Sequence, residues 1–155
     1  MQGRSWMAAL ALAAGVALAL VGRPAPTRAG DVEPVVNKVA LTLRITGVGK
    51  DGCEIEVKPG HAACEFEPVT KKITELRQGQ AQITLDLAKV RSTSPDRDCQ
   101  FSITIKEPNQ PPRVVRRGIR LVAPAAGVAL PEQTFVCYLR SPSLAAKDEA
   151  ERRLR

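Results

Sequence analysis

The segment from Gly79 to Lys106 reads GQAQITLDLAKVRSTSPDRDCQFSITIK and contains two runs in which apolar and polar residues alternate. Apolar residues occupy every second position from Ala81 to Leu87 and again from Cys99 to Ile105. A period of two is typical of β-strands with one buried face. The intervening stretch, Arg91 to Asp98, is rich in residues that favour exposed turns. We therefore expect an antiparallel pair of strands at the centre of a β domain.

Similar alternation recurs on both sides of this pair. Shorter runs lie at 39–46, 53–57, 64–67, 113–123 and 135–139, while 71–77 fits either a crossing segment or an irregular strand. Three glycines between Gly47 and Gly52 predict a turn with positive φ, and Pro68 interrupts the strand before it. The pattern predicts an all-β fold, a small antiparallel immunoglobulin- or fibronectin-like sandwich of about seven strands. A small barrel is the alternative.

The two ends of the chain differ from this domain. Residues 8–21 form an apolar run that is shorter than the roughly 20 residues needed to span a bilayer, and small residues flank Arg28. We expect residues 1–29 to be a secretory signal peptide cut after Ala29, with an uncleaved anchor as the alternative. Residues 30–140 are the expected β domain. Residues 141–155 form a polar tail that we expect to be helical or flexible, with Ser141 to Ser143 suited to a helix start.

The charge of the exported part is only mildly basic. The whole chain carries a formal net charge of +7, and removal of residues 1–29 takes away three arginines and no acid, which leaves +4. Few aromatic side chains remain to stack on bases. We therefore expect no nucleic-acid partner, no membrane span after signal cleavage, and a secreted or periplasmic location.

All four cysteines follow the expected signal peptide. They are Cys53, Cys64, Cys99 and Cys137. An even number in a small exported domain predicts two disulfides. We favour Cys53 with Cys64 and Cys99 with Cys137, although a bond between Cys53 and Cys99 would resemble the intersheet bridge of immunoglobulin-like domains. There is no Cys-x-x-Cys motif and only one histidine, so we expect no metal ion and no cofactor.

Catalysis has little support in the sequence. A nucleophile usually needs a base within reach, most often a histidine. The single histidine, His61, lies in a turn beside Gly60, where a solvated side chain is the usual outcome. The cysteines are expected to be oxidised, which removes thiolate chemistry. We therefore expect a protein that is not an enzyme and assign no catalytic residue.

An acidic cluster is the first candidate surface. Its members, two on each of two strand-like runs, are Glu54, Glu56, Glu65 and Glu67. If these strands pair, the four carboxylates share one exposed face and need nearby lysines as compensation. Calcium suits carboxylate oxygens, but no Asp-rich ligand loop is present. We interpret the cluster as solvated charge.

A basic cluster is the candidate binding site. It consists of four arginines within eight residues, Arg113, Arg116, Arg117 and Arg120. On an edge strand these side chains would either protect the edge from aggregation or bind an unidentified acidic protein or an anionic envelope polymer. The sequence thus favours an exported, non-catalytic module that binds or spaces partners. The alternative is a small proteinase inhibitor that presents the rigid segment from Gln110 to Arg113.

Overall fold

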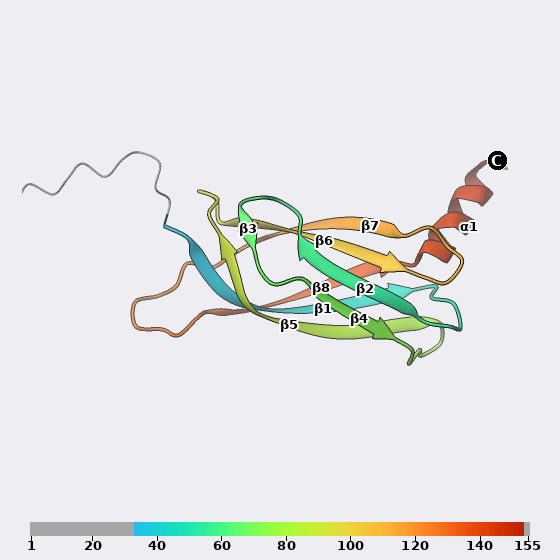
Figure 1. Cartoon of the computed structure of the whole chain (residues 1–155), viewed down its shortest axis with the longest axis horizontal. Helices are drawn as coiled ribbons and strands as arrows, with labels where there is room; N and C mark the ends of the chain where they lie inside the picture. The colour runs from blue at the N-terminus through green and yellow to red at the C-terminus, as the bar shows by residue number, and fades with distance from the viewer. Residues whose placement is uncertain (1–32, 154–155) are drawn as a thin grey trace, which may run out of the picture. The chain divides into compact units, whose positions relative to one another are not determined.

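The computed structural model describes residues 33–153, which form two four-stranded sheets and one helix (Figure 1). Sheet A contains β1 (Val35–Thr46), β3 (Cys64–Glu65), β5 (Gln80–Ser92) and β8 (Glu132–Arg140), in the order β3-β5-β1-β8. Sheet B contains β2 (Cys53–Pro59), β4 (Val69–Ile73), β6 (Asp98–Lys106) and β7 (Arg113–Arg120), in the order β4-β2-β6-β7. The all-β class is confirmed. The expected signal peptide, residues 1–29, lies outside the described residues.

The hydrophobic core lies between the two sheets. Leu41 and Leu43 of β1 are fully buried, as are Phe101 and Ile103 of β6 in the other sheet. Their strand neighbours at the intervening positions of β1 point outward and are partly or fully exposed. The alternation in the sequence therefore predicted correctly which side chains fill the core.

The expected central pair is wrong as a pairing. Both strands exist, but β5 lies in sheet A between β3 and β1, whereas β6 lies in sheet B between β2 and β7. The connection from Thr93 to Arg97 carries the chain from one sheet to the other. Alternation reveals which face of a strand is buried but not which strand lies beside it, because two strands that face each other across a core show the same pattern as two that pair.

The structure has eight strands where about seven were expected, and one of its pairings is parallel. The region around Pro68 contributes two short strands, β3 in sheet A and β4 in sheet B, because the chain changes sheet there. β8 pairs in parallel with β1, from Lys38 with Glu132 to Thr46 with Arg140. The long connection of residues 121–131 returns the chain to the end of the sheet at which β1 begins, so sheet A is mixed rather than purely antiparallel.

The turn between β1 and β2 has the predicted positive backbone angles. Gly47 has a φ of 75° and Gly52 a φ of 77°. A Cβ atom built on Gly52 would lie 2.0 Å from the carbonyl oxygen of Ile73. Only glycine fits at that position, because any side chain would collide with the backbone of β4 as well as strain φ.

Helix α1 (Pro142–Arg153) begins directly after β8, so the tail has the helical form that was one of two expected. The Ser141 hydroxyl accepts a hydrogen bond from the Leu144 backbone N–H at 3.1 Å and donates one to the Gly47 carbonyl oxygen. The buried Glu107 carboxylate accepts hydrogen bonds from the backbone N–H groups of Gly49 at 2.9 Å and Ser143 at 2.8 Å. One carboxylate therefore holds both the first helical turn and the β1–β2 turn.

Candidate functional site

All four predicted arginines lie in β7, which pairs only with β6 and is the outermost strand of sheet B. Alternation along the strand divides them between two faces. Arg116 and Arg120 lie on the outer face of sheet B, whereas Arg113 and Arg117 share the phase of Ile119, which is buried against the core. The four arginines therefore lie at one edge of sheet B, but their side chains are divided between the two faces of the strand.

The contacts of these side chains differ. Arg120 Nε lies 3.2 Å from Asp98 Oδ1 and forms the one salt bridge that any of the four makes within residues 33–153. Arg113 donates a hydrogen bond of 2.7 Å to the Arg140 carbonyl oxygen, and Arg117 donates one of 3.4 Å to the carbonyl oxygen of Arg116. Carbonyl oxygens carry no net charge, so three of the four positive charges are not neutralised by a described carboxylate.

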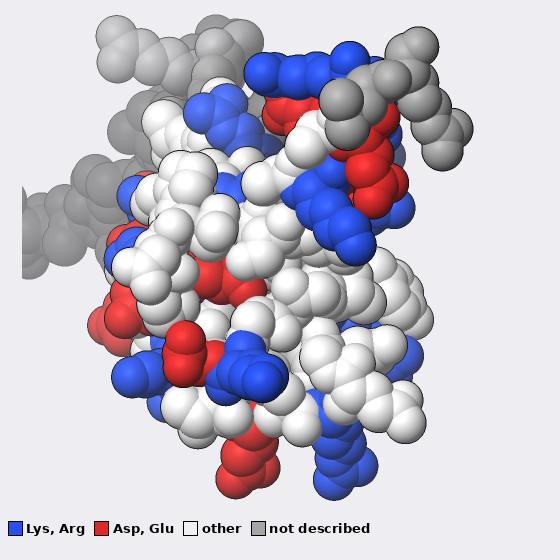
Figure 2. Space-filling view, turned by 90° about the vertical axis from the view of Figure 1, so that its right-hand side faces the viewer, with Lys and Arg blue, Asp and Glu red and all other residues white. Residues whose placement is uncertain are grey.

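Charge is more evenly distributed elsewhere. At the end of the molecule that carries α1, basic and acidic side chains are interspersed (Figure 2). There the Arg140 guanidinium pairs with Asp148, and Arg153 pairs with Glu149, which lies one helical turn before it. β7 is therefore a segment in which basic side chains accumulate without acidic partners in their own strand.

The side of the molecule that contains β7 and β8 is closed by hydrogen bonds between the sheets. At one end Arg113 of β7 bonds to the carbonyl of Arg140 in β8. Near the other end the Gln133 side chain accepts a hydrogen bond from the Val122 backbone N–H at 3.1 Å and donates one to the Arg120 carbonyl oxygen at 3.3 Å. A single amide thus satisfies two backbone groups at the end of β7.

The cysteines form a pairing that differs from both arrangements considered in the sequence. Cys64 of β3 is bonded to Cys99 of β6, which links sheet A to sheet B. The favoured bonds Cys53–Cys64 and Cys99–Cys137 are both wrong, and one disulfide forms where two were expected. β2 and β3 belong to different sheets and are not neighbours, and Cys99 is bonded to Cys64. Cys53 and Cys137 are buried free thiols.

Both free thiols are held in the protonated form. Burial raises the pKa of the Cys53 thiol to about 11, and the Glu107 carboxylate adds to the rise. Burial also raises the pKa of Cys137, although the positive charge of Arg117 opposes it. A thiol with a raised pKa is a poor nucleophile, so neither cysteine is suited to thiolate chemistry at neutral pH.

The expected acidic cluster is divided between the two sheets. Glu54 and Glu56 lie on sheet B, where the Lys106 ammonium is 2.9 Å and 3.9 Å from their respective carboxylates. The hydrogen bond to Glu54 raises the pKa of Lys106. Glu65 lies on sheet A and pairs with Arg91 at 3.5 Å. The four carboxylates do not share a face, because β2 pairs with β4 and β6 rather than with β3.

His61 lies in an exposed turn, at the margin of a hollow of about 510 Å³ that Ser94, Asp98 and Arg120 also line. Its Nδ1 atom accepts a hydrogen bond of 3.1 Å from the backbone N–H of Ala63. The imidazole thus stabilises its own turn, and among the described contacts no hydrogen bond joins it to a hydroxyl or carboxylate. Within residues 33–153, no group of three or more His, Cys, Asp or Glu side chains is arranged to hold a metal ion.

The segment expected to act in a proteinase inhibitor forms a turn before β7. The backbone N–H of Gln110 bonds to the Glu107 carbonyl oxygen at 3.3 Å, and Pro111 and Pro112 are exposed. The Arg113 side chain, however, is directed to the carbonyl of Arg140. This orientation gives no specific support to a role of Arg113 in a protease cleft.

Sequence reasoning missed two features. One is Glu107, whose burial could not be inferred from a charged residue placed before a proline. The other is the uncovered side of β5, which faces away from β1. It could not be inferred from the sequence, because it results from the shortness of β3.

Comparisons of the chain with models of protein families, with curated proteins and with solved structures give no match. Among the residues that the structure describes, no helix has the length and apolar character required to cross a membrane.

Proposed function

We propose that the protein is an exported, non-catalytic binding module whose β7 edge contacts an acidic partner in the cell envelope or outside the cell. The observation that carries this proposal is the basic edge strand, in which three of four arginines have no described carboxylate partner. Guanidinium groups bind carboxylates and phosphates through paired hydrogen bonds. The partner is an unidentified acidic protein or an anionic envelope polymer.

Two further observations support export and the finer form of the fold. The Cys64–Cys99 bond suits an oxidising compartment, which is where disulfides persist in most organisms. The same bond connects two four-stranded sheets across the core, which favours an immunoglobulin- or fibronectin-like sandwich within this proposal.

The test compares capture of partners by the wild type with capture by the double variant Arg116→Glu and Arg117→Glu. Neither arginine bonds to a distant described residue, so the fold should tolerate both changes. The matched control is Lys50→Glu with Lys58→Glu, which makes the same charge change on exposed residues of the β1–β2 turn and of β2, outside β7.

We expect in-cell crosslinking to recover a partner with the wild type and with the lysine control, and to lose it with the β7 variant. Increasing salt should elute the partner, because the contact is electrostatic. Recovery of the same partners by all three proteins would show that β7 is not the contact surface and that its arginines only protect an edge.

A further inference from the structure

The strand β5 has an uncovered side. It pairs with β1 along its whole length, but on its other side β3 pairs only with Arg91 and Ser92. The chain then leaves sheet A, and after Pro68 it enters β4 in sheet B. At the beginning of β5, an isolated bridge joins Arg77 to Gln80 on this side, with two backbone hydrogen bonds of 2.9 Å. No other described strand pairs with this side of β5 between Ala81 and Lys89. An unpaired side presents rows of backbone N–H and C=O groups that can hydrogen-bond to another strand.

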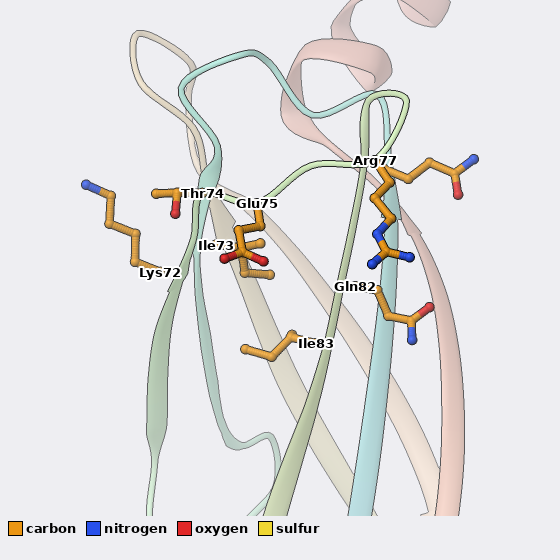
Figure 3. Close-up of a pocket in the computed structure, with 8 residues that line it drawn as sticks. Lys72, Ile73, Thr74, Glu75, Arg77, Gln82 and Ile83 are labelled. Carbon is orange, nitrogen blue, oxygen red and sulfur yellow. The ribbon is translucent and has the colours of Figure 1, made fainter.

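Two hollows lie along this open edge. One, of about 590 Å³, separates β4 from the beginning of β5, and Figure 3 shows Ile83 projecting into it from β5. The other, of about 700 Å³, lies toward the end of β5 and is lined by Phe66, Val69 and Leu87 among others. Ile83, Phe66 and Val69 are only partly buried. A strand added to this edge would cover that apolar surface.

The open edge lacks the features that usually prevent strand addition. From Gln80 to Leu87 the sequence contains no proline, lysine or arginine, and Asp86 is its one charged residue. The pairing with β1 is regular along this stretch, and its irregularity begins only beyond Leu87. β7, in contrast, carries four arginines. The β5 edge therefore lacks the positive charge that the β7 edge carries, a feature that discourages the addition of a strand.

The two ends of the open edge have opposite charge. Two basic residues and one acidic residue line the first hollow, and these are Lys72, Arg77 and Glu75. Three acidic and two basic residues line the second, and these are Glu65, Glu67, Asp86, Lys89 and Arg91. An antiparallel copy of the same edge, related by a two-fold axis, would place each basic end beside an acidic end.

We propose that the open edge of β5 pairs antiparallel with the same edge of a second copy of this chain. The pairing joins the two copies of sheet A into one continuous sheet. It satisfies the unpaired backbone groups and covers both hollows in each copy. The charge complementarity of the two ends occurs twice in the dimer, because the interface is symmetric.

The sequence of β5 selects a register for this pairing. With Thr84 on the two-fold axis, Gln82 lies opposite Asp86 of the second copy on the outer face, and Ile83 lies opposite Leu85 on the inner face. The outer pair can form an amide–carboxylate hydrogen bond, and the inner pair is apolar. No like charges face each other in this register.

Sedimentation velocity over a range of concentrations tests the proposal on the full chain. We expect the wild type to form a dimer, and Thr84→Lys to raise the dimer dissociation constant at least about tenfold, because two ammonium groups then meet at the axis. The matched control, Thr134→Lys, makes the same change at an exposed position of β8, the other edge of sheet A, and should dimerise like the wild type. Circular dichroism checks that each variant is folded.

A charge exchange tests the register without relying on Thr84→Lys. Gln82→Glu places carboxylates opposite Asp86 and should weaken the dimer, whereas Gln82→Glu combined with Asp86→Lys should restore it. A wild type that stays monomeric at its highest soluble concentration would overturn the proposal. So would a dimer that Thr84→Lys leaves intact, one that Thr134→Lys weakens equally, or one that the charge exchange fails to restore.

Discussion

The two sides of the molecule, at which the sheets end, are completed differently. On the β7–β8 side, Arg113 and Gln133 form hydrogen bonds between the two sheets, and arginines line the edge. On the β4–β5 side, the side of β5 that faces away from β1 is paired with a described strand only at Arg91 and Ser92, and two hollows lie along it. In Figure 1, β7 runs along the upper side of the strands and β5 along the lower.

The two sides therefore offer different kinds of surface, and the alternation of apolar and polar residues in the sequence does not distinguish them. The β7–β8 side is bridged by the side chains of Arg113 and Gln133 and presents positive charge, so it suits a contact that is electrostatic and reversible. The open side presents unpaired backbone and apolar surface, so it suits the addition of a strand. The following predictions test whether the two sides are as different in stability as they are in structure.

The largest expected effect comes from the Cys64–Cys99 disulfide, which connects the two sheets. Replacing Cys64 and Cys99 by serine should lower the free energy of unfolding by about 3–4 kcal/mol, because the bond closes a loop with a sequence separation of 35. Urea unfolding measures the loss. The wild type in reducing buffer should approach the stability of the double variant, and a wild type that reductant does not destabilise would contradict the assigned bond.

The next effect concerns Glu107, which holds α1 to the β1–β2 turn. Glu107→Gln should cost about 1–3 kcal/mol at pH 7, because a buried charge-assisted hydrogen-bond network loses its charge. The control, Glu132→Gln, is exposed at the beginning of β8 and should change stability by less than about 0.5 kcal/mol. Equal effects of the two changes in urea unfolding would contradict the anchoring role.

The contribution of Glu107 should also depend on pH. Burial acts to raise the pKa of this carboxyl, but the hydrogen bonds from Gly49 and Ser143 outweigh burial and lower the pKa below its ordinary value of 4.5. The folded state therefore favours the ionised form, and its stabilising effect is present above pH 4.5 and lost as the pH falls through the lower folded value. The difference between wild type and Glu107→Gln should shrink on acidification, and a difference that grows would contradict the sign.

The smallest expected effect compares one glutamine on each side. Gln133→Ala should cost about 1 kcal/mol, because two hydrogen bonds to the backbone of β7 and the residues after it are lost. Hydrogen exchange of the Val122 amide should become faster. Gln82→Ala on the open edge removes no described hydrogen bond and should leave the stability of the monomer nearly unchanged. Similar losses for both variants would mean that the two sides are not differently closed.

Much of the fold could be predicted from local pattern. The period of two identified most of the strands and their buried faces, although it left the segment that contains the end of β4 undecided. The glycines from Gly47 to Gly52 identified a turn with positive φ. The pairing of the strands could not be predicted, because β5 and β6 bury similar faces whether they pair within one sheet or face each other across the core. The cysteine pairing failed for the same reason, since it depends on the sheet to which β3 belongs.

The candidate site was predictable in composition and less so in geometry. Four arginines within eight residues could be read directly, and their place on an edge strand agrees with the proline-rich segment before them. The sequence could not show which arginine pairs with a carboxylate, because Asp98 lies opposite Arg120 only as a result of the register between β6 and β7. The open edge of β5 depends on the shortness of β3, for which Pro68 was the one signal in the sequence.

The strand order has a consequence for the strength of binding. Because β5 and β7 lie on opposite sides of the molecule, two chains joined through β5 would carry their two arginine strands at the far ends of the pair. Such a dimer is bivalent toward a repetitive acidic polymer or a clustered partner. Once one arginine strand is bound, the second acts at a raised effective concentration, so weak individual contacts become a durable attachment.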